Sequence, residues 1–283
     1  MEKSRTHGHV RTVTSRLDRL ILPFIGKKPV ADIVTGGILS LAKKEEAAGR
    51  IETAHRVMQI CGQIMRYAVA TGRTDMDPTS SLKESLVSGN PEHFPTMTNP
   101  EQIGGLLRVI DSLNGSPIVC CAVKLQILTF VRPGELRLAE WSEISKTEWK
   151  IPPERMKMRR PHIVPLSAQA LAVLDELRPV TNSKSRYLFP SIRDFRRPMS
   201  DMTINAALRR MGYSQQELTG HSFRSMASTI LNGNGWPPDV IERQLVHIER
   251  NTVRAAYNHA EHLEKRREMM QWWGAWFEDQ MGK

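Results

Sequence analysis

The sequence predicts a mainly α-helical protein with a small antiparallel sheet, an α+β fold in two parts. Apolar residues recur at helical spacing over most of the chain. A stretch rich in Pro, Gly, Asn and Thr interrupts this spacing near residue 90, which is typical of a linker. Alternation typical of strands is found only over a short region, residues 141–166.

The first part, residues 5–86, is predicted to be all-helical. VRTVTSRLDRLILPFIG has helical spacing and is expected to stop at Gly26, ahead of Pro29. TGGILSLAKKEEAAGR predicts a second helix, with Thr35 as a candidate cap. The strongest amphipathic pattern, IETAHRVMQICGQIMRYAVATG, ends at Gly72, and DPTSSLKESL predicts a short last helix.

Residues 87–98 form the predicted linker, and residues 99–283 form the second unit. Two helices are expected first, from PEQIGGLLRVIDSLNG and SPIVCCAVKLQILTFV. EWSEISKTEWKIP and PHIVPLS then predict strands around a basic turn, PERMKMRR, as part of a three-stranded sheet. Beyond Ser167, helical spacing returns in SAQALAVLDELRPV, DMTINAALRRMG, HSFRSMASTILNGNG, PDVIERQLVH and HLEKRREMMQWWGAWFEDQM.

The charge balance favours a polyanionic partner. Forty Lys and Arg stand against 30 Asp and Glu, which gives a formal net charge of +10. A basic excess of this size most often accompanies nucleic-acid binding. The ordinary alternative is a basic protein with no such partner, and charge alone leaves both open.

The cysteines and the apolar runs exclude other classes. Cys61, Cys120 and Cys121 form no C-x-x-C pair and have apolar neighbours, which favours buried, reduced thiols over disulfides or a zinc site. No signal-peptide pattern is found, and no apolar run approaches the roughly twenty residues that a membrane helix needs. A cytoplasmic protein, associated with the nucleoid and with no membrane partner, is therefore expected.

Residues of catalytic types follow one another through the second unit. Arg132 stands at a helix junction in TFVRPGELRLAEW, with Glu135 one turn further on. His221 and Arg224 in HSFRSMAS are three residues apart, hence on one helix face. The remaining members are Lys157 in the basic turn, and His247 and Tyr257 in QLVHIERNTVRAAYNHA.

In this order, the motifs resemble those of the tyrosine recombinases. Their sequences are most similar to the motifs of the P4-type prophage and genomic-island integrases. H-x-x-R alone is a weak signal, but six matched positions in order, with a strand hairpin after the first arginine, are specific. The resemblance covers nearly the whole chain. It implies a helical, SAM-like core-type DNA-binding domain over 5–86 and a tyrosine-recombinase catalytic domain over 99–283. P4-type members usually begin with a further small arm-binding domain, which this chain is expected to lack.

The resemblance implies an enzyme that cuts and rejoins DNA through a 3′-phosphotyrosine intermediate, integrating or excising a mobile element. Tyr257 would be the nucleophile. Arg132 and Arg224 would hold the non-bridging phosphate oxygens with paired donors. Lys157 would protonate the 5′ leaving oxygen.

Three further residues would support this chemistry. His221 and His247 would bond the phosphate and help to position or deprotonate the phenol, whose pKa is otherwise about 10. Glu135 would orient a catalytic arginine or histidine. Covalent catalysis keeps the bond energy in the phosphotyrosine, so no ATP, metal or other cofactor is implied.

Each residue also has an ordinary interpretation. A lone tyrosine in a helical segment, such as Tyr257, is usually a core or interface residue. Arg132 beside Pro133 could be a charge at a helix start, and His221 could cap a helix. Lys157 lies among arginines, so a basic turn that only touches phosphates would look alike. Taken together, these interpretations require six coincidences in family order.

Other chemistries find little support. FIGKKP lacks the upstream glycine and the hydroxyl of a phosphate-binding loop. His259 and His262 have a spacing that suits a metal, but no further ligands are evident near them.

The family implies that the two domains clamp the duplex, with contacts mostly to phosphates and a steep salt dependence. Candidate contacts are Arg159 and Arg160 on the hairpin, and Lys43, Lys44 and Arg66 in the first unit. A run of charges is more often a solvated helix face, so these are weaker candidates than the catalytic set.

Assembly is also implied. Family members act as four protomers on two DNA sites, so a homotetramer on paired attachment sites is expected, with DNA-bending accessory proteins as further partners. The amphipathic segment EMMQWWGAWFEDQM would pack on its own domain or dock in a neighbouring subunit, and the sequence leaves both open.

Two rival functions remain. A catalytically silent integrase remnant would bind attachment sites without recombining them, and a type IB-like topoisomerase would use the same chemistry but act alone. One departure from the family pattern is Val246, where many relatives have glycine or alanine before the second histidine. This valine is expected to be tolerated, although it could crowd the site.

Overall fold

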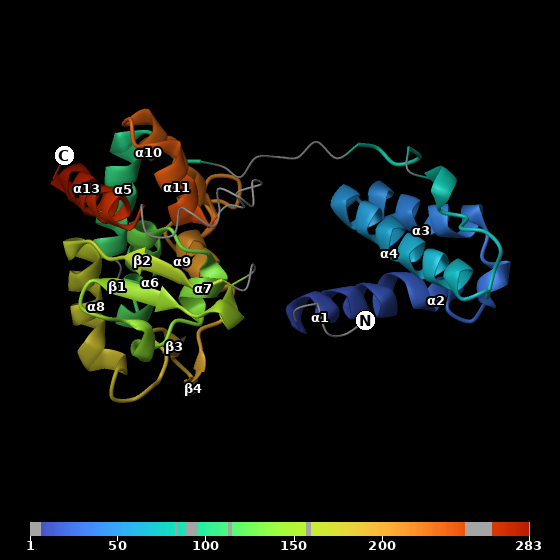
Figure 1. Ribbon diagram of the computed structural model, residues 1–283, viewed down its shortest axis with the longest axis horizontal. Helices are drawn as coiled ribbons and strands as arrows, with labels where there is room; N and C mark the ends of the chain where they lie inside the picture. The colour runs from blue at the N-terminus through green and yellow to red at the C-terminus, as the bar shows by residue number, and fades with distance from the viewer. Residues whose placement is uncertain are drawn as a thin grey trace. The chain divides into compact units, whose positions relative to one another are not determined.

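The computed structural model of the protein describes residues 7–82, 84–88, 96–112, 115–156, 160–246 and 262–282. The chain divides into two compact units, Met1–Glu92 and His93–Lys283, each with its own hydrophobic core (Figure 1). The mainly helical fold with small antiparallel sheets is confirmed. Within the described ranges, no helix is long and apolar enough to cross a membrane.

The N-terminal unit opens with one helical run. It consists of α1 (His7–Arg16), a π-helical stretch η2 (Leu17–Ile21) and α2 (Leu22–Ile25), and its last turn is closed by a bond from Gly26 N–H to the Leu22 carbonyl. The run therefore ends where the sequence predicts, but the π-helical stretch was not predicted. A short 3₁₀ turn, η3 (Val30–Asp32), follows.

Two longer helices, α3 (Thr35–Ala47) and α4 (Ile51–Ala70), pack against each other and complete this unit. The prediction of Thr35 as a cap is wrong, because the helix already includes Thr35 and Val34 is the capping residue. The predicted last helix is only a 3₁₀ turn, η4 (Ser80–Leu82). There, the Asp77 carboxylate accepts bonds from Thr79 N–H and Oγ, a local pattern that competes with helix formation.

The C-terminal unit, which contains the candidate catalytic residues and is called the catalytic unit below, is built around α6 (Pro117–Thr129). This helix is buried on almost every side. A helix that is apolar all round belongs in a core. Helices α5 (Pro100–Asp111), α8 (Ala168–Thr181) and α13 (Leu263–Gly282) surround it. The remaining short elements are α7 (Pro133–Arg137), η5 (Trp141–Glu143), η6 (Pro153–Arg155), α9 (Thr203–Arg210), α10 (Ser222–Gly233) and α11 (Pro238–Leu245).

The strands form two separate antiparallel pairs in the described part of the chain. In the first pair, β1 (Glu148–Ile151) and β2 (His162–Pro165) place Ile151 opposite His162. The second pair is β3 (Pro190–Ser191) and β4 (Asp194–Pro198). The prediction of a single three-stranded sheet is therefore wrong. The second pair escaped prediction because PSIRDFRRP is short, charged and bounded by prolines, which are unfavourable in strands.

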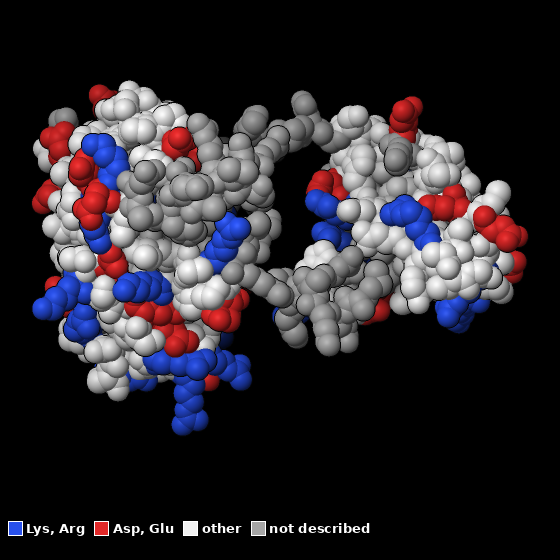
Figure 2. Space-filling view, in the orientation of Figure 1, with Lys and Arg blue, Asp and Glu red and all other residues white. Residues whose placement is uncertain are grey.

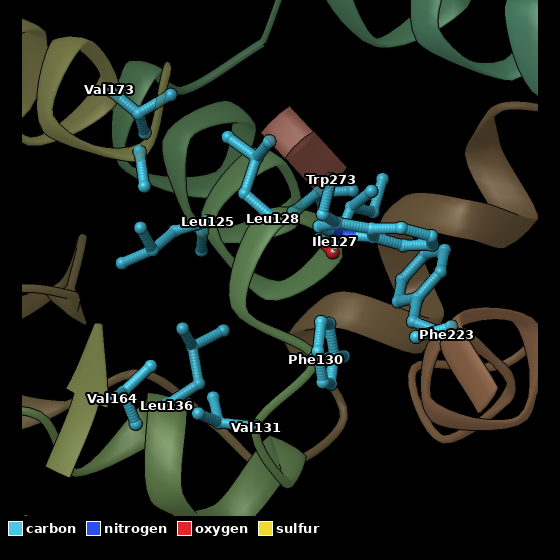
Figure 3. Close-up of a cluster of buried hydrophobic side chains, with 14 of the residues drawn as sticks. Leu125, Ile127, Leu128, Phe130, Val131, Leu136, Val164, Val173, Phe223 and Trp273 are labelled. Atoms are coloured by element: carbon cyan, nitrogen blue, oxygen red, sulfur yellow. Dashed lines mark hydrogen bonds between the residues drawn. The ribbon is translucent and has the colours of Figure 1, made fainter. Parts of the chain in front are cut away.

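Helix α13 packs on its own unit. Met269, Met270, Trp273 and Phe277 are buried in the core that α5, α6 and α8 also form. The indole N–H of Trp273 donates to the Ile127 carbonyl at 3.0 Å, and Figure 3 shows these residues in one cluster. Of the two arrangements that the sequence left open for this segment, the structure has the one within the chain.

Candidate active site

Two arginines from separate parts of the chain meet at the candidate site. Arg132 follows α6 and stands at the N-terminus of α7. Arg224 lies in the first turn of α10, and its side chain is buried, with 5% exposed. Burial, and then the neighbouring Arg132, lower the pKa of Arg224 to about 10. The two guanidiniums also donate to consecutive backbone carbonyls, those of Val246 and Leu245, so they lie side by side and can act on one anion.

Glu135 holds Arg132 in place. Its carboxylate accepts from the backbone N–H of Arg132 at 2.9 Å and from the guanidinium NH1 at 2.8 Å. Only 4% of Glu135 is exposed, so this ion pair is shielded from solvent. Because Glu135 bonds both the backbone and the guanidinium of Arg132, it fixes the direction of the Arg132 side chain.

Backbone carbonyls at two helix ends hold the arginines from the other side. Arg224 donates to the carbonyl of Phe130, at 2.8 Å, and to that of Leu245. Arg132 donates to the carbonyl of Val246 at 3.2 Å. Phe130 ends α6 and Val246 ends α11. Because the C-terminal end of a helix carries partial negative charge, it is a favourable place for a guanidinium.

The backbone is strained at the same two places. Phe130 (φ 40°) and Val246 (φ 53°) are the non-glycine residues with positive φ in the described ranges. Bulky and β-branched residues rarely adopt this conformation. The ring of Phe130 is locked in the core, edge-on to Trp273 at 5.6 Å and close to Phe223 (Figure 3). At Val246 the unusual feature is thus its left-handed backbone, which the expectation of side-chain crowding did not include.

His221 stands directly before α10, and its loop is firmly held. Gly220 N–H donates to the Asn205 side chain at 2.9 Å, and the Gly220 carbonyl accepts from Gln126 of α6 at 2.8 Å. His221 occupies the capping position of α10, but its side chain makes no capping bond. The ordinary interpretation of His221 as a helix cap is therefore not supported by the geometry.

A second histidine, His162 on β2, belongs to the same region and was not predicted. Only 6% of it is exposed, and its Nε2 has no hydrogen-bond partner among the residues that the structure describes. Burial, followed by Arg266, Arg243, Arg224 and Arg132, holds the pKa of His162 well below its usual value. His162 is therefore a neutral imidazole among four cations. Strand alternation in PHIVPLS, which puts His162 and Val164 on one face, was the signal available in the sequence.

Two arginines outside the predicted set, Arg243 on α11 and Arg266 on α13, extend the basic region. Burial, followed by the exposed Arg160 at the end of the basic turn, lowers the pKa of Arg243. Four predicted residues, Lys157, Arg159, His247 and Tyr257, lie outside the described residues.

The candidate DNA contacts of the N-terminal unit are exposed and have local partners. Lys43 is paired with Glu46 at 2.7 Å and Arg66 with Asp77 at 3.4 Å, while Lys44 lies over an aromatic ring. Figure 2 shows basic side chains interleaved with acidic ones on the face drawn. In the described part of this unit, these cations are not brought together as the arginines of the candidate site are. Across the described ranges, no group of three or more His, Cys, Asp or Glu could hold a metal ion.

Comparisons with known sequences identify several integrases as relatives. The integrase of Enterobacteria phage P4 is 40% identical over 96% of this chain, and prophage integrase IntA of Escherichia coli K12 is 38% identical over 95%. The putative protein IntB of the same strain is 40% identical over 96% of the chain. The chain spans 65% of the length of the first two and 72% of the third.

Solved structures share the fold. A lambda integrase tetramer bound to a Holliday junction matches with a TM-score of 0.71 at 18% identity, covering 90% of this chain and 72% of that one. The Tn1549 transposon integrase in complex with circular intermediate DNA matches with a TM-score of 0.67 at 14% identity, covering 95% of each chain.

Family models cover both units. The phage integrase central domain matches residues 1–85 and the phage integrase family matches residues 97–264. The unmatched stretch between them, residues 86–96, overlaps the predicted linker. The paired arginines, the relatives and these two matches together show that the chain belongs to the phage integrase family of tyrosine recombinases.

Proposed function

We propose that this chain is a site-specific recombinase that cuts and rejoins double-stranded DNA, integrating or excising a mobile element. The observation that carries the proposal is the pair Arg132 and Arg224, held together on helix-end carbonyls and a buried carboxylate. A guanidinium has five N–H donors, and the contacts described for each arginine leave donors for phosphate oxygens. Such donors stabilise the charge that develops in the transition state.

The chemical step uses residues that lie between these two arginines in the sequence or after them. The phenol oxygen of Tyr257 attacks the phosphorus, its proton passes to a histidine, His221 or His247, and a bond from phosphorus to the tyrosine forms. The bond from phosphorus to the 5′ oxygen breaks, and Lys157 protonates that oxygen. Rejoining is the reverse, with a 5′ hydroxyl attacking the phosphotyrosine, so the cycle needs no external energy.

The partners follow from the same mechanism. We place Arg159, Arg160, Lys43, Lys44 and Arg66 on the DNA backbone, as positioning contacts rather than base contacts. The lambda integrase structures contain dimers and a tetramer on DNA, which supports a homotetramer on paired attachment sites for this chain. DNA-bending accessory proteins and a place in the bacterial nucleoid complete the proposal.

Covalent capture on DNA tests the function. Nicked fragments pooled from host and element DNA are incubated with wild type or Tyr257→Phe, detergent is added, and DNA that stays attached to protein is sequenced. Adducts with wild type alone are expected, and their sequences identify the site. Binding without adducts from either protein would support a silent remnant instead. Adducts that form and turn over on a single, unpaired site would support a topoisomerase.

A further inference from the structure

Arg266, near the start of α13, joins three elements of the catalytic unit. Its Nε and NH2 donate to the side-chain oxygen of Gln244 on α11, at 3.0 and 2.6 Å. NH2 also donates to the carbonyl of Ile163 on β2. Only 5% of Arg266 and 2% of Gln244 are exposed, so the junction is shielded from water.

The charge of Arg266 is unusual for so buried a group. Its bonds to Gln244 and Ile163 go to neutral acceptors, and burial, followed by Arg243, lowers its pKa to about 9. Glu148 acts on the pKa of Arg266 in the opposite direction, but its carboxylate bonds Arg267. Burying a cation costs free energy that its partners must offset, and neutral acceptors bind a cation less strongly than a carboxylate does. An arginine at this place is therefore a candidate for a role in positioning the elements that it joins.

The three elements that Arg266 joins all lie next to predicted catalytic residues in the sequence. Gln244 and Arg266 bracket the stretch that carries His247 and Tyr257, and they lie close to its two ends. Ile163 lies on the strand that follows Lys157. A single guanidinium thus ties together the chain on both sides of the predicted nucleophile and the strand beside the predicted acid.

Arg267, the next residue, offers a direct contrast. Its side chain is 36% exposed and it pairs with two carboxylates, those of Glu148, at 2.6 Å, and Glu264. Such partly exposed pairs contribute little and have no link to α11. Arg267 is therefore a matched control: the same residue type on the same helix, without the three-way junction.

We propose that Arg266 is a positioning residue for strand cleavage: it joins α11 and α13, which come before and after the Tyr257 stretch in the sequence, to β2, and so controls how the phenol meets the phosphate. The proposal rests on the function proposed above, because it assigns Tyr257 as the nucleophile. It assigns to the buried Arg266 no contact with DNA or with the reacting atoms.

The expected effect is on the chemical step. A displacement of about 1 Å in a reacting group can slow a reaction about a hundredfold, so Arg266→Met should reduce single-turnover cleavage about a hundredfold. DNA affinity should stay within about twofold, because no phosphate contact is lost. Arg266→Lys, which can still reach one acceptor, should fall between. Arg267→Met should cleave like wild type.

A sulfur substrate separates positioning of the nucleophile from positioning of the acid. In a nicked duplex of the captured site, the 5′ bridging oxygen is replaced by sulfur; a thiol has a pKa of about 8.5, so the leaving group needs no acid. This duplex should restore cleavage to Lys157→Ala and leave Arg266→Met slow. Cleavage by Arg266→Met at the wild-type rate on oxygen, or its full recovery on sulfur, would overturn the proposal.

A measurement without DNA keeps this proposal separate from the proposed function. Amide hydrogen exchange over residues 247–261 is compared in wild type, Arg266→Met, Arg266→Lys and Arg267→Met. Exchange about tenfold faster in Arg266→Met alone, with the α6 core unchanged, is expected. Unchanged exchange in Arg266→Met would contradict the positioning role of Arg266, even if wild type cleaves DNA. If wild type forms no adducts while exchange responds as expected, the proposed recombinase function is contradicted. The role of Arg266 in ordering residues 247–261 is then still supported.

Discussion

The two units of this chain differ in the burial of their basic residues: in the described ranges, exposed ion pairs occur in both units, but buried arginines only in the second. In the N-terminal unit, Lys43 and Arg66 are exposed and paired with nearby carboxylates. In the catalytic unit, Arg224 and Arg266 are buried, and their described bonds go to carbonyl and amide oxygens. Exposed ion pairs contribute little to stability, whereas burying a guanidinium costs free energy that its partners must offset. Burial of a cation is thus the better indication of function.

The largest effect should come from the most buried cation of the arginine pair. Arg224→Ala should slow strand cleavage by about 10²–10³-fold, since it removes donors that act on the transition-state charge. Single-turnover cleavage of the captured site measures this. Arg178→Ala, on the exposed face of α8, is the control and should cleave normally. A near-normal rate for Arg224→Ala would remove it from the phosphate clamp and break the comparison between the two units.

Sequence reasoning chose the candidate catalytic residues but not the environment of those that the structure describes. Arg132, Glu135, His221 and Arg224 could be chosen from motifs because a motif is local. The left-handed backbone at Val246 could not be predicted, since nothing in a valine signals it. Cys61, Cys120 and Cys121 are buried and form no disulfide in the described part of the chain, as their apolar neighbours predict.

His162 and Arg266 show why the rest was missed. Each lies in a segment whose pattern is explained by its secondary structure, and each acquires its neighbours only when β2, α11 and α13 come together. Helical spacing predicted α13 itself correctly, but not that Gly104 and Gly274 would allow its close approach to α5 and α8. Local spacing thus predicts elements, whereas sites depend on contacts between them.

The second prediction concerns the pH dependence of stability. The folded protein holds the pKa of His162 well below its usual value, so the unfolded chain binds this proton first as the pH falls. The stability that depends on a neutral His162 is fully present above about pH 6.5. Below that pH the free energy of unfolding falls by up to about 1.4 kcal/mol per pH unit for one proton. His162→Leu should flatten this slope. Urea unfolding between pH 7.5 and 5 measures it, and equal slopes in the two proteins would contradict a buried neutral imidazole.

The third prediction uses the strained end of α11. At Val246, glycine tolerates the positive φ and alanine does not, so Val246→Gly should be more stable than Val246→Ala by about 1 kcal/mol. At Val240, inside the same helix, the order should reverse by a similar amount, about 1 kcal/mol, because glycine is a poor helix former. Thermal unfolding of the four variants measures both differences. The same order at both positions would argue against a left-handed residue at 246.

The smallest effects should come from the exposed cations, where the comparison between the units is sharpest. Arg66→Ala and Lys44→Ala should each change the free energy of unfolding by less than about 0.5 kcal/mol, because their charges already face water. If each contacts a phosphate, each substitution should also lower the slope of log affinity against log salt by about one, uniformly across DNA sequences. Fluorescence anisotropy with duplex DNA at several salt concentrations measures this slope. An unchanged slope would leave these residues as a solvated helix face and leave the arginines of the catalytic unit as the stronger candidates for phosphate binding.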